Sequence, residues 1–320
     1  FSIFFGDLQR QWGPVGLNGI SLSNYSYPRT SWAFYVGKPS INLRALGAEL
    51  RDEVDSLGNT VHRYWFGHRL AFNVTKRFRV ALWETTVLSG VDQNFLARYR
   101  NPASILILAN TYGLSAEGNV MIGTDLYWRV ARGVTLEAQI AIDDIQYQNR
   151  SGSDRFPDRL AGTIAAYGPL GSRMAWRALY TRASSLAFRA QNPFENFTDA
   201  GVGIGRNFAD NDQLKAIVSV PIRQQWVLAP EATVRRQGQG RLTDPIPPDV
   251  GNVPQIFIGT VETTYRLGVT LSGRQGILDI QTNLGVNQVH NAGHQTGVNR
   301  TEFEGWVQAT LALDWQGVIK

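Results

Sequence analysis

The sequence predicts an all-β protein: a transmembrane, antiparallel β-barrel of about 14 strands in a bacterial outer membrane. Three observations support this fold class. Apolar and polar residues alternate along many segments, these segments are long for strands, and short turns alternate with longer polar connections. The chain begins at Phe1 without an initiator methionine or a signal segment. If an N-terminal part is missing, we expect about 16 to 18 strands in the full barrel.

The alternation is clearest in the segment that follows Gly133. One face of this segment carries Val134, Leu136, Ala138, Ile140 and Ile142. The other face carries Thr135, Glu137, Gln139, Ala141 and Asp143. Successive side chains of a strand point to opposite faces, so the first set predicts a lipid-facing surface and the second a polar interior. The same pattern recurs over 119–130 and 302–315.

The lengths of the segments and of their connections separate a barrel from a soluble β-sandwich. The alternating runs last about 11 to 16 residues, whereas globular strands average about 5 or 6 and a tilted bilayer-crossing strand needs about 9 to 11. Short turns are expected near 38–39, 76–77, 132–133, 168–172, 222–223 and 273–276. Longer polar connections are expected near 8–30, 55–61, 90–118, 148–158, 188–211, 238–255 and 291–300. Seven loops that alternate with six turns give fourteen strands, with both ends of the barrel chain on the periplasmic side.

We therefore expect one barrel domain over 1–320, with its largest loops at 8–30, 90–118, 188–211 and 238–255. The apolar run 105–112 does not fit the regular alternation of short turns and long loops, because a strand there would reverse the direction of every later strand. We predict that it belongs to the loop at 90–118 and packs against the mouth or inside the barrel. Aromatic residues near the expected strand ends, among them Trp65 and Trp83, predict girdles at the membrane interface, with burial in a core as the alternative.

Several classes of function are excluded or disfavoured. The longest apolar stretch, 103–109, is far shorter than the roughly 20 residues of a membrane-spanning helix. The chain has no cysteine, so it has no disulfides and no thiol chemistry. Its 31 basic residues are scattered rather than clustered, which disfavours a nucleic-acid partner. His290 and His294 are four residues apart but lie in a polar loop, so we predict no metal site and no cofactor.

No serine, histidine and acid are spaced to single out a catalytic triad, so we expect no enzymatic activity. An outer-membrane hydrolase is the less favoured alternative. The polar faces of the strands carry charges of both signs, which predicts a paired network inside the barrel and argues against a strongly ion-selective pore. The residues expected to line the lumen include Arg69, Asp125, Arg129, Glu137, Arg177, Glu262 and Glu304.

The most distinctive stretch of the sequence is near its start. Gly6 is followed by the run Arg10-Gln-Trp12-Gly13-Pro14, then by Leu-Ser23-Asn and a proline at 28. This stretch resembles the signature of the Wzi family of outer-membrane capsule-assembly proteins, although Asp7 stands where the family has arginine. Further similarity covers the run from Tyr99 and Arg100 to Pro102, and segments at 118–125, 143–144 and 201–212.

The resemblance implies an outer-membrane barrel that binds and helps anchor or assemble capsular or other surface polysaccharide. The glycan-binding residues predicted on this basis are Arg10, Trp12, Gly13, Pro14, Ser23, Tyr99 and Arg100. Trp12 offers a flat face to a sugar ring, and Arg10 offers a planar fork to a uronate carboxylate. The alternative is that this loop folds inward and plugs the barrel, and the two interpretations are compatible.

A general diffusion porin for small solutes is the second functional hypothesis. The expected partners are outer-membrane lipid, lipopolysaccharide and a surface polysaccharide. The sequence does not fix the identity of the glycan or the oligomeric state.

Overall fold

The computed structural model describes residues 1–8, 10–13, 19–24, 27–93, 105, 118–131, 133–144 and 156–311. Fourteen strands form one antiparallel sheet in which each strand pairs with the next strand of the sheet along the chain. They are β1 Ser2–Leu8, β2 Arg29–Lys38, β3 Ile41–Val54, β4 Thr60–Asn73, β5 Phe78–Gly90, β6 Asn119–Ala131, β7 Val134–Asp144, β8 Arg159–Leu170, β9 Met174–Ala183, β12 Asn211–Arg223, β13 Trp226–Gln237, β14 Glu262–Gln275, β15 Leu278–His290 and β16 Asn299–Leu311. The predicted all-β fold with fourteen strands is confirmed.

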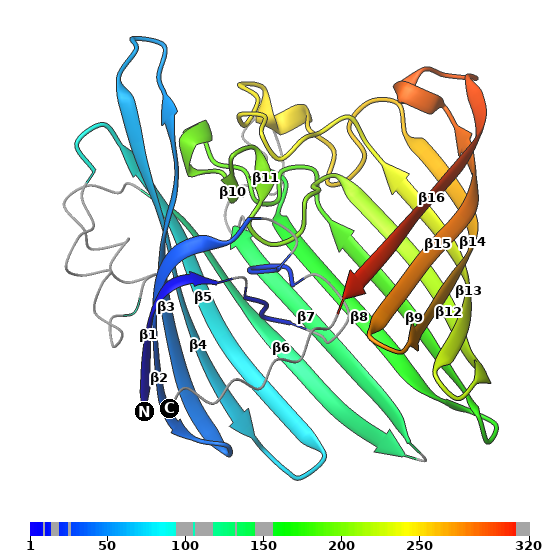
Figure 1. Cartoon of the computed structure of the whole chain (residues 1–320). Coiled ribbons are helices and arrows are strands. Elements are labelled where there is room, and N and C mark those ends of the chain that lie inside the picture. The colour runs from blue at the N-terminus through cyan, green and yellow to red at the C-terminus, as the bar shows by residue number, and fades with distance from the viewer. Residues whose placement is uncertain are drawn as a thin grey trace.

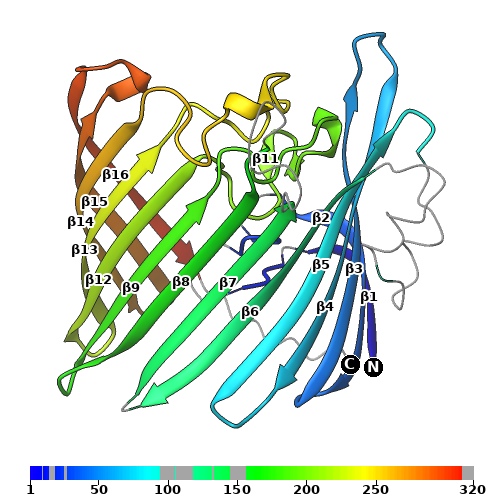
Figure 2. The same cartoon turned by 180° about the vertical axis from the view of Figure 1, so that it is seen from behind.

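The sheet curls round to form a barrel wall (Figure 1; Figure 2 from behind). Its strands from β2 onward are 10 to 14 residues long, as crossing a bilayer requires. Over the residues listed above, no ladder joins β16 to β1, so the wall is not closed there. Within the same residues, no helix is long and apolar enough to cross a membrane.

Strand ends joined by short turns lie at one end of the wall, which we call the turn end. Strand ends joined by longer connections lie at the other, the loop end (Figure 1). The short turns are 39–40, 74–77, 132–133, 171–173, 224–225 and 276–277. Gly171 and Gly276 have φ of +65° and +62°, a region that glycine adopts without strain. The longer connections are 9–28, 55–59, 91–118, 145–158, 184–210, 238–261 and 291–298.

In the described part of the chain, three of these connections contain a 3-10 helix. The 184–210 connection holds the 3-10 helix η1 Pro193–Glu195 and a two-stranded hairpin of β10 Thr198–Asp199 and β11 Val202–Gly203. The 3-10 helices η2 Val250–Asn252 and η3 Ala292–His294 lie in the next two. Of the apolar run 105–112, only Ile105 is among the described residues, and it is 53% exposed.

Burial along β7 follows the alternation of its sequence. Glu137 and Gln139 are buried, whereas Ile140 is 46% exposed and its neighbours Leu136 and Ala138 are partly exposed. The apolar face of β7 thus points outward, where lipid would lie, and the polar face points into the barrel.

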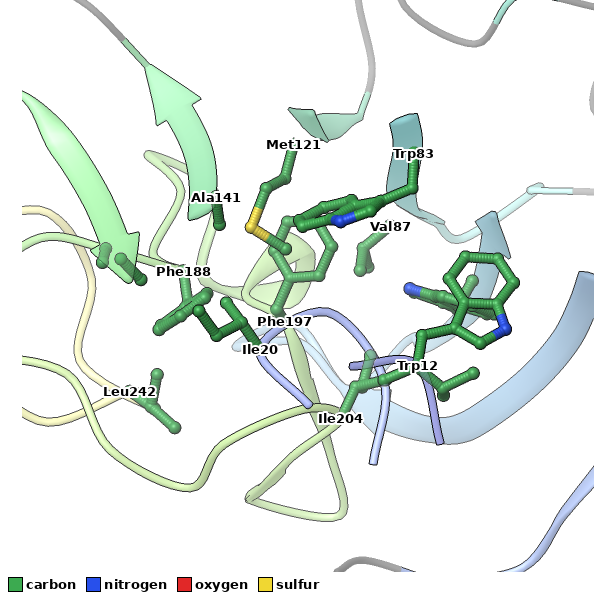
Figure 3. Close-up of a cluster of buried hydrophobic side chains, with 14 of the residues drawn as sticks. Trp12, Ile20, Trp83, Val87, Met121, Ala141, Phe188, Phe197, Ile204 and Leu242 are labelled. Atoms are coloured by element: carbon green, nitrogen blue, oxygen red, sulfur yellow. The ribbon is translucent and has the colours of Figure 1, made fainter. Parts of the chain in front are cut away.

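A hydrophobic core fills part of the interior (Figure 3). Inward-facing strand residues supply one part of it, and two connections supply the rest. The strand residues include Leu46, Leu50, Trp65, Trp83, Val87, Met121 and Ala141; the 9–28 connection adds Trp12, Ile20 and Leu22; the 184–210 connection adds Phe188, Phe197 and Ile204. Trp65 and Trp83, predicted as girdle residues, are only 2% and 4% exposed and belong to this core, because loops folded into the barrel cover them.

Candidate functional site: an inward-folded loop and an arginine cavity

The first connection turns into the barrel and folds back on itself. Trp12 and Leu22 form an isolated antiparallel bridge, in which the Trp12 amide donates to the Leu22 carbonyl at 3.0 Å. A Cβ on Gly19 would lie 1.8 Å from the Trp12 carbonyl oxygen, so only glycine allows this close approach. Both Figure 1 and Figure 2 show this segment inside the curve of the sheet.

Gln139 on β7 fastens the folded loop to the wall. Its side-chain oxygen accepts the amide of Ile20 at 2.6 Å, and its amide nitrogen donates to the Trp12 carbonyl at 3.2 Å. The same nitrogen donates to Asp125 at 2.8 Å, and Asp125 also accepts from Trp83 Nε1 at 2.9 Å. Gln139 has no exposed surface, so its amide group satisfies backbone groups that would otherwise be buried without partners.

Trp12 packs against the wall rather than facing water. It is 4% exposed, and its ring centroid is 5.9 Å from that of Trp65. A Cβ on Gly67 would lie 3.0 Å from the Trp12 ring, so the absence of a side chain there makes room for the indole. This placement supports the predicted plug contact and leaves little of the ring for stacking on a sugar.

The 184–210 connection covers the folded loop from the loop end. Ser23 is buried; its amide donates to the Ile204 carbonyl at 3.0 Å, and its hydroxyl donates to the Gly205 carbonyl at 2.7 Å. Arg63 on β4 holds the same connection, because its guanidinium donates to the carbonyls of Phe194, Asn196 and Thr198.

Asp210 fixes the base of that connection to the next one. It is fully buried, with a φ of +54°, and its carboxylate accepts the amides of Gly240, Phe257 and Ile258. These bonds give the buried Asp210 carboxylate a structural role without a bound cation. Among the described residues, no group of three or more His, Cys, Asp or Glu side chains could hold a metal.

Beside the folded loop lies a cavity of about 430 Å³, which we call the arginine cavity. The side chains that define its chemistry are Phe4 on β1, Tyr35 on β2, Arg44 on β3, and Arg10, Gln11 and Trp12 of the folded loop. Of the described residues that line it, none is acidic and none is a histidine. The register pairs Tyr35 with Arg44 and Arg44 with Arg69, so Arg44 lies on the same inward face as Arg69.

Two guanidinium groups of the arginine cavity have no acidic partner among the residues that the structure describes. Arg10 lies over the Phe4 ring at 4.6 Å, and its Nε and Nη2 are buried without a hydrogen-bond acceptor. Arg44 lies over the Tyr35 ring at 5.6 Å. The pKa of Arg10 is lowered, first by its burial and second by repulsion from Arg44. An anion placed between these groups would relieve that repulsion and supply the missing acceptor.

A buried arginine in the 184–210 connection also has no acidic partner among the residues that the structure describes. Arg206 is 8% exposed, and burial lowers its pKa to about 10. Its guanidinium lies 5.5 Å from the centroid of the Phe208 ring, and its Nε has no hydrogen-bond acceptor.

The structure brings three of the predicted glycan-binding residues into the folded loop: Arg10, Trp12 and Gly13. A Cβ on Gly13 would lie 2.8 Å from the Gln139 side-chain oxygen, so this glycine too makes room for the loop's anchor. Ser23 lies where the loop meets the 184–210 connection and is bonded to it. Pro14, Tyr99 and Arg100 lie outside the described residues.

The residues predicted to line the lumen all lie on the inward faces of their strands, and most are paired. Arg69 donates to Asp125 at 2.8 Å, and Glu137 accepts from the Tyr167 hydroxyl at 2.9 Å. Arg177 lies 5.3 Å from the centroid of the Tyr167 ring.

The remaining three predicted lumen residues lie near the strand ends or on β14 and β16, the last strands of the wall. Arg129 donates to the Tyr127 hydroxyl at 2.8 Å near the turn end, and Glu262 accepts the Gly293 amide at 2.7 Å at the loop end. Glu304 pairs with Arg266 at 2.9 Å.

Sequence reasoning did not single out Arg44. It placed Arg63 among the lumen-facing charges and Gln139 on the interior face of its strand, but it did not predict that either residue anchors a loop. For Arg44, the alternation that places it on the same face as Leu46 was available as a signal. The roles of Arg63 and Gln139 depend on backbone groups more than 100 residues away in the chain, for which no local pattern exists.

Several solved structures resemble this fold. One match is Wzi of Escherichia coli, described as an outer membrane protein involved in group 1 capsule assembly and as a carbohydrate-binding β-barrel. The likeness has a TM-score of 0.64 at 10% sequence identity, and it covers 98% of this chain and 68% of the other. The chain has a Wzi-like β-barrel fold.

Two further matches score lower. The ferric enterobactin receptor PfeA of Pseudomonas aeruginosa has a TM-score of 0.35 at 11% identity, covering 89% of this chain and 56% of the receptor. A FadL homologue of the same organism has a TM-score of 0.33 at 10% identity, covering 94% of this chain and 81% of the homologue. No family model and no curated protein matches the sequence.

Proposed function

We propose that this chain is an outer-membrane β-barrel that binds an acidic surface polysaccharide in the arginine cavity and helps to anchor or assemble it. The observation that carries this proposal is the pair of guanidinium groups, Arg10 and Arg44, which line one cavity with no carboxylate among its described lining residues. A uronate carboxylate is a planar acceptor that matches the guanidinium fork. The Wzi-like fold supports the proposal, since Wzi is a carbohydrate-binding barrel.

The aromatic residues beside the two arginines suit a sugar ligand. The rings of Phe4 and Tyr35 line the arginine cavity next to the cations, and Phe4 is 36% exposed. A sugar ring presents an apolar face that can lie on such a ring while its acidic group meets the guanidinium. The cavity is thus suited to an acidic sugar rather than to a free inorganic anion.

The role we propose is binding without catalysis. General acid and base chemistry on a glycan needs carboxyl groups on both sides of the bond that breaks. The described lining residues of the arginine cavity supply cationic donors and no carboxyl group.

The test uses the purified full chain and polysaccharide extracted from the surface of its own source cells. Arg10→Gln and Arg44→Gln should each weaken binding about tenfold to a hundredfold, equivalent to about 1 to 3 kcal/mol. Arg129→Gln is the matched control, since Arg129 is an exposed arginine on the lumen face outside the cavity. Polysaccharide whose carboxyl groups have been reduced to alcohols should bind weakly to the unaltered protein.

Equal binding of the reduced and native polysaccharide would contradict the acidic-glycan assignment. Unchanged binding by both arginine variants would move the site away from the cavity. Trp12→Ala serves a different purpose, because its burial predicts a loss of stability of about 3 to 5 kcal/mol. A weaker affinity of Trp12→Ala would indicate a contact with the glycan only if its melting temperature is unchanged.

A general diffusion porin is the second candidate, and one observation favours it. The inward-facing residues Glu302, Glu304 and Gln308 of β16 are exposed, so the part of the lumen beside this strand is not filled by the loops. Single-channel conductance in planar bilayers separates the two functions. A lumen blocked by the folded loop should pass little current, whereas a diffusion porin should pass a large and steady one.

A further inference from the structure

A second cavity, of about 320 Å³, lies at the loop end of the wall, and we call it the loop-end cavity. Asn119 and Arg159 line it from the first positions of β6 and β8, two strands that run from the loop end to the turn end (Figure 1). Phe156, Ile246 and residues of the 184–210 connection complete its described lining. It shares no described lining residue with the arginine cavity.

The side chain of Asn119 is a buried donor without an acceptor. Asn119 lies on the inward face of β6, as does Met121 two residues further on, and it is only 6% exposed. Its Nδ2 is buried, and no described residue accepts a hydrogen bond from it. A buried amide donor without an acceptor destabilises a fold, so a ligand atom that accepts this bond would remove the cost.

The charged residues of the described lining are Arg159 and Glu195, one of each sign. The Arg159 Nη1 donates to the Arg189 carbonyl at 2.6 Å and lies 3.6 Å from the Asp143 carboxylate. The Glu195 carboxylate accepts from the Asn192 side-chain nitrogen at 3.2 Å. Because the two charges balance and neighbouring groups already hold them, the loop-end cavity favours a neutral ligand.

Apolar side chains surround the free donor. Phe156, Leu186, Ala190 and Ile246 all line the loop-end cavity with Asn119. An acetamido group suits this combination, because its carbonyl oxygen accepts a hydrogen bond and its methyl group is apolar. A hydroxyl group in the same place would also have to donate, and its donor would face apolar side chains.

We propose that the loop-end cavity binds an N-acetylated neutral sugar unit of the surface polysaccharide. The acetamido carbonyl accepts from Asn119 Nδ2, the methyl group packs against Leu186 and Ala190, and the sugar ring lies against Phe156. This inference rests on the proposed function. It adds a second class of sugar to the acidic units that the arginine cavity holds.

The experiment measures the binding of short oligosaccharides to the purified full chain by isothermal titration calorimetry, in a detergent without a sugar head group. Triacetylchitotriose and cellotriose are the probes. They have the same glycosidic linkage and differ in the acetamido group that replaces one hydroxyl group on each ring. The unaltered protein should bind triacetylchitotriose about tenfold more tightly than cellotriose.

Two variants test the placement of the sugar. Asn119→Leu should abolish the preference for triacetylchitotriose without lowering the melting temperature, because it removes a buried donor that has no described partner. Gln191→Trp adds a ring at an exposed position of the lining and should weaken triacetylchitotriose binding about tenfold or more. Gln295→Trp is the matched control, since Gln295 is also exposed and lies in the 291–298 connection, and it should bind as the unaltered protein does.

Equal affinity for the two probes would overturn the proposal, and so would a preference that survives Asn119→Leu. If Asn119→Leu lowers the melting temperature, Gln191→Trp decides: unchanged binding there, or an equal loss in Gln295→Trp, overturns the placement. Tighter binding of N-acetyl-trialanine than of triacetylchitotriose would show that the loop-end cavity takes a peptide instead.

The arginine variants separate these outcomes from a failure of the proposed function. Arg10→Gln and Arg44→Gln should bind triacetylchitotriose as the unaltered protein does, because this probe carries no charge. If the unaltered protein binds the native polysaccharide but not triacetylchitotriose, only the assignment of the loop-end cavity is wrong. If it binds triacetylchitotriose but not the native polysaccharide, the proposed function is wrong.

Discussion

The side chain of Gln139 holds the folded loop in place inside the barrel. Its amide group bonds two backbone groups of the folded loop and the carboxylate of Asp125, all in a buried setting. Removing one partner of a buried hydrogen bond leaves the other unsatisfied, at a cost of about 1 to 3 kcal/mol for each group. The loss is larger than for an ordinary lumen residue because three bonds share this side chain.

We therefore expect Gln139→Ala to lower the free energy of unfolding by about 2 to 5 kcal/mol. The control is Gln281→Ala, which removes an exposed, inward-facing glutamine on β15 and should cost less than about 0.5 kcal/mol. Urea titrations of refolded protein in detergent measure both. Similar small losses in the two variants would mean that the folded loop is not held by Gln139.

Each strand has two faces with different surroundings: the outward face is apolar and suited to lipid, and the inward face meets water or packed side chains. Ile140 near the middle of β7 faces outward and is 46% exposed, whereas the inward-facing Gln139 beside it is fully buried by the folded loop. The lumen is thus not uniformly aqueous, and a charge placed at Gln139 would meet a packed core. Gln281 on β15 is exposed and is the better example of a water-facing lumen residue.

We expect Ile140→Arg to cost about 2 to 4 kcal/mol, because the charge would enter the hydrocarbon near its midplane. Gln281→Arg should cost about 1 kcal/mol or less, since its charge stays in water. Refolding titrations into lipid vesicles give both values. Equal costs would mean that the face of β7 carrying Ile140 does not meet lipid.

At the scale of the whole molecule, all short turns lie at one end of the wall and the long connections at the other, where the 184–210 and 238–261 connections cover the inner core (Figure 1). Outer-membrane barrels place short turns in the periplasm and long loops outside the cell. The connection at 238–261 should thus be outside the cell, and the turn at 276–277 inside the periplasm.

Proteinase K added to intact cells should cut within 238–255 and leave 273–276 uncut. Permeabilising the outer membrane should then expose the second site, which serves as the control for protease access. Cleavage at 273–276 in intact cells, with 238–255 protected, would show the opposite orientation.

The sequence by itself determined the strands, their order and the ends at which they turn. Period-two alternation and the positions of glycine and polar residues are local properties, and each strand of such a barrel pairs with its neighbours in the chain. Local reasoning therefore sufficed for the fourteen strands and for the outward face of Ile140. It placed the turns near 38–39 and 273–276, close to the observed 39–40 and 276–277.

Only the tertiary structure decided what fills the interior. The contacts of Gln139 with Ile20, of Arg63 with the 184–210 connection, and of Asp210 with Ile258 join segments far apart in the sequence. No periodicity records such contacts, because they depend on where irregular loops go once the wall has formed. Trp12 could thus be recognised as an aromatic residue in a distinctive motif. Its burial against Trp65, and the two arginines that share the cavity beside it, follow from the packing of the loop inside the barrel.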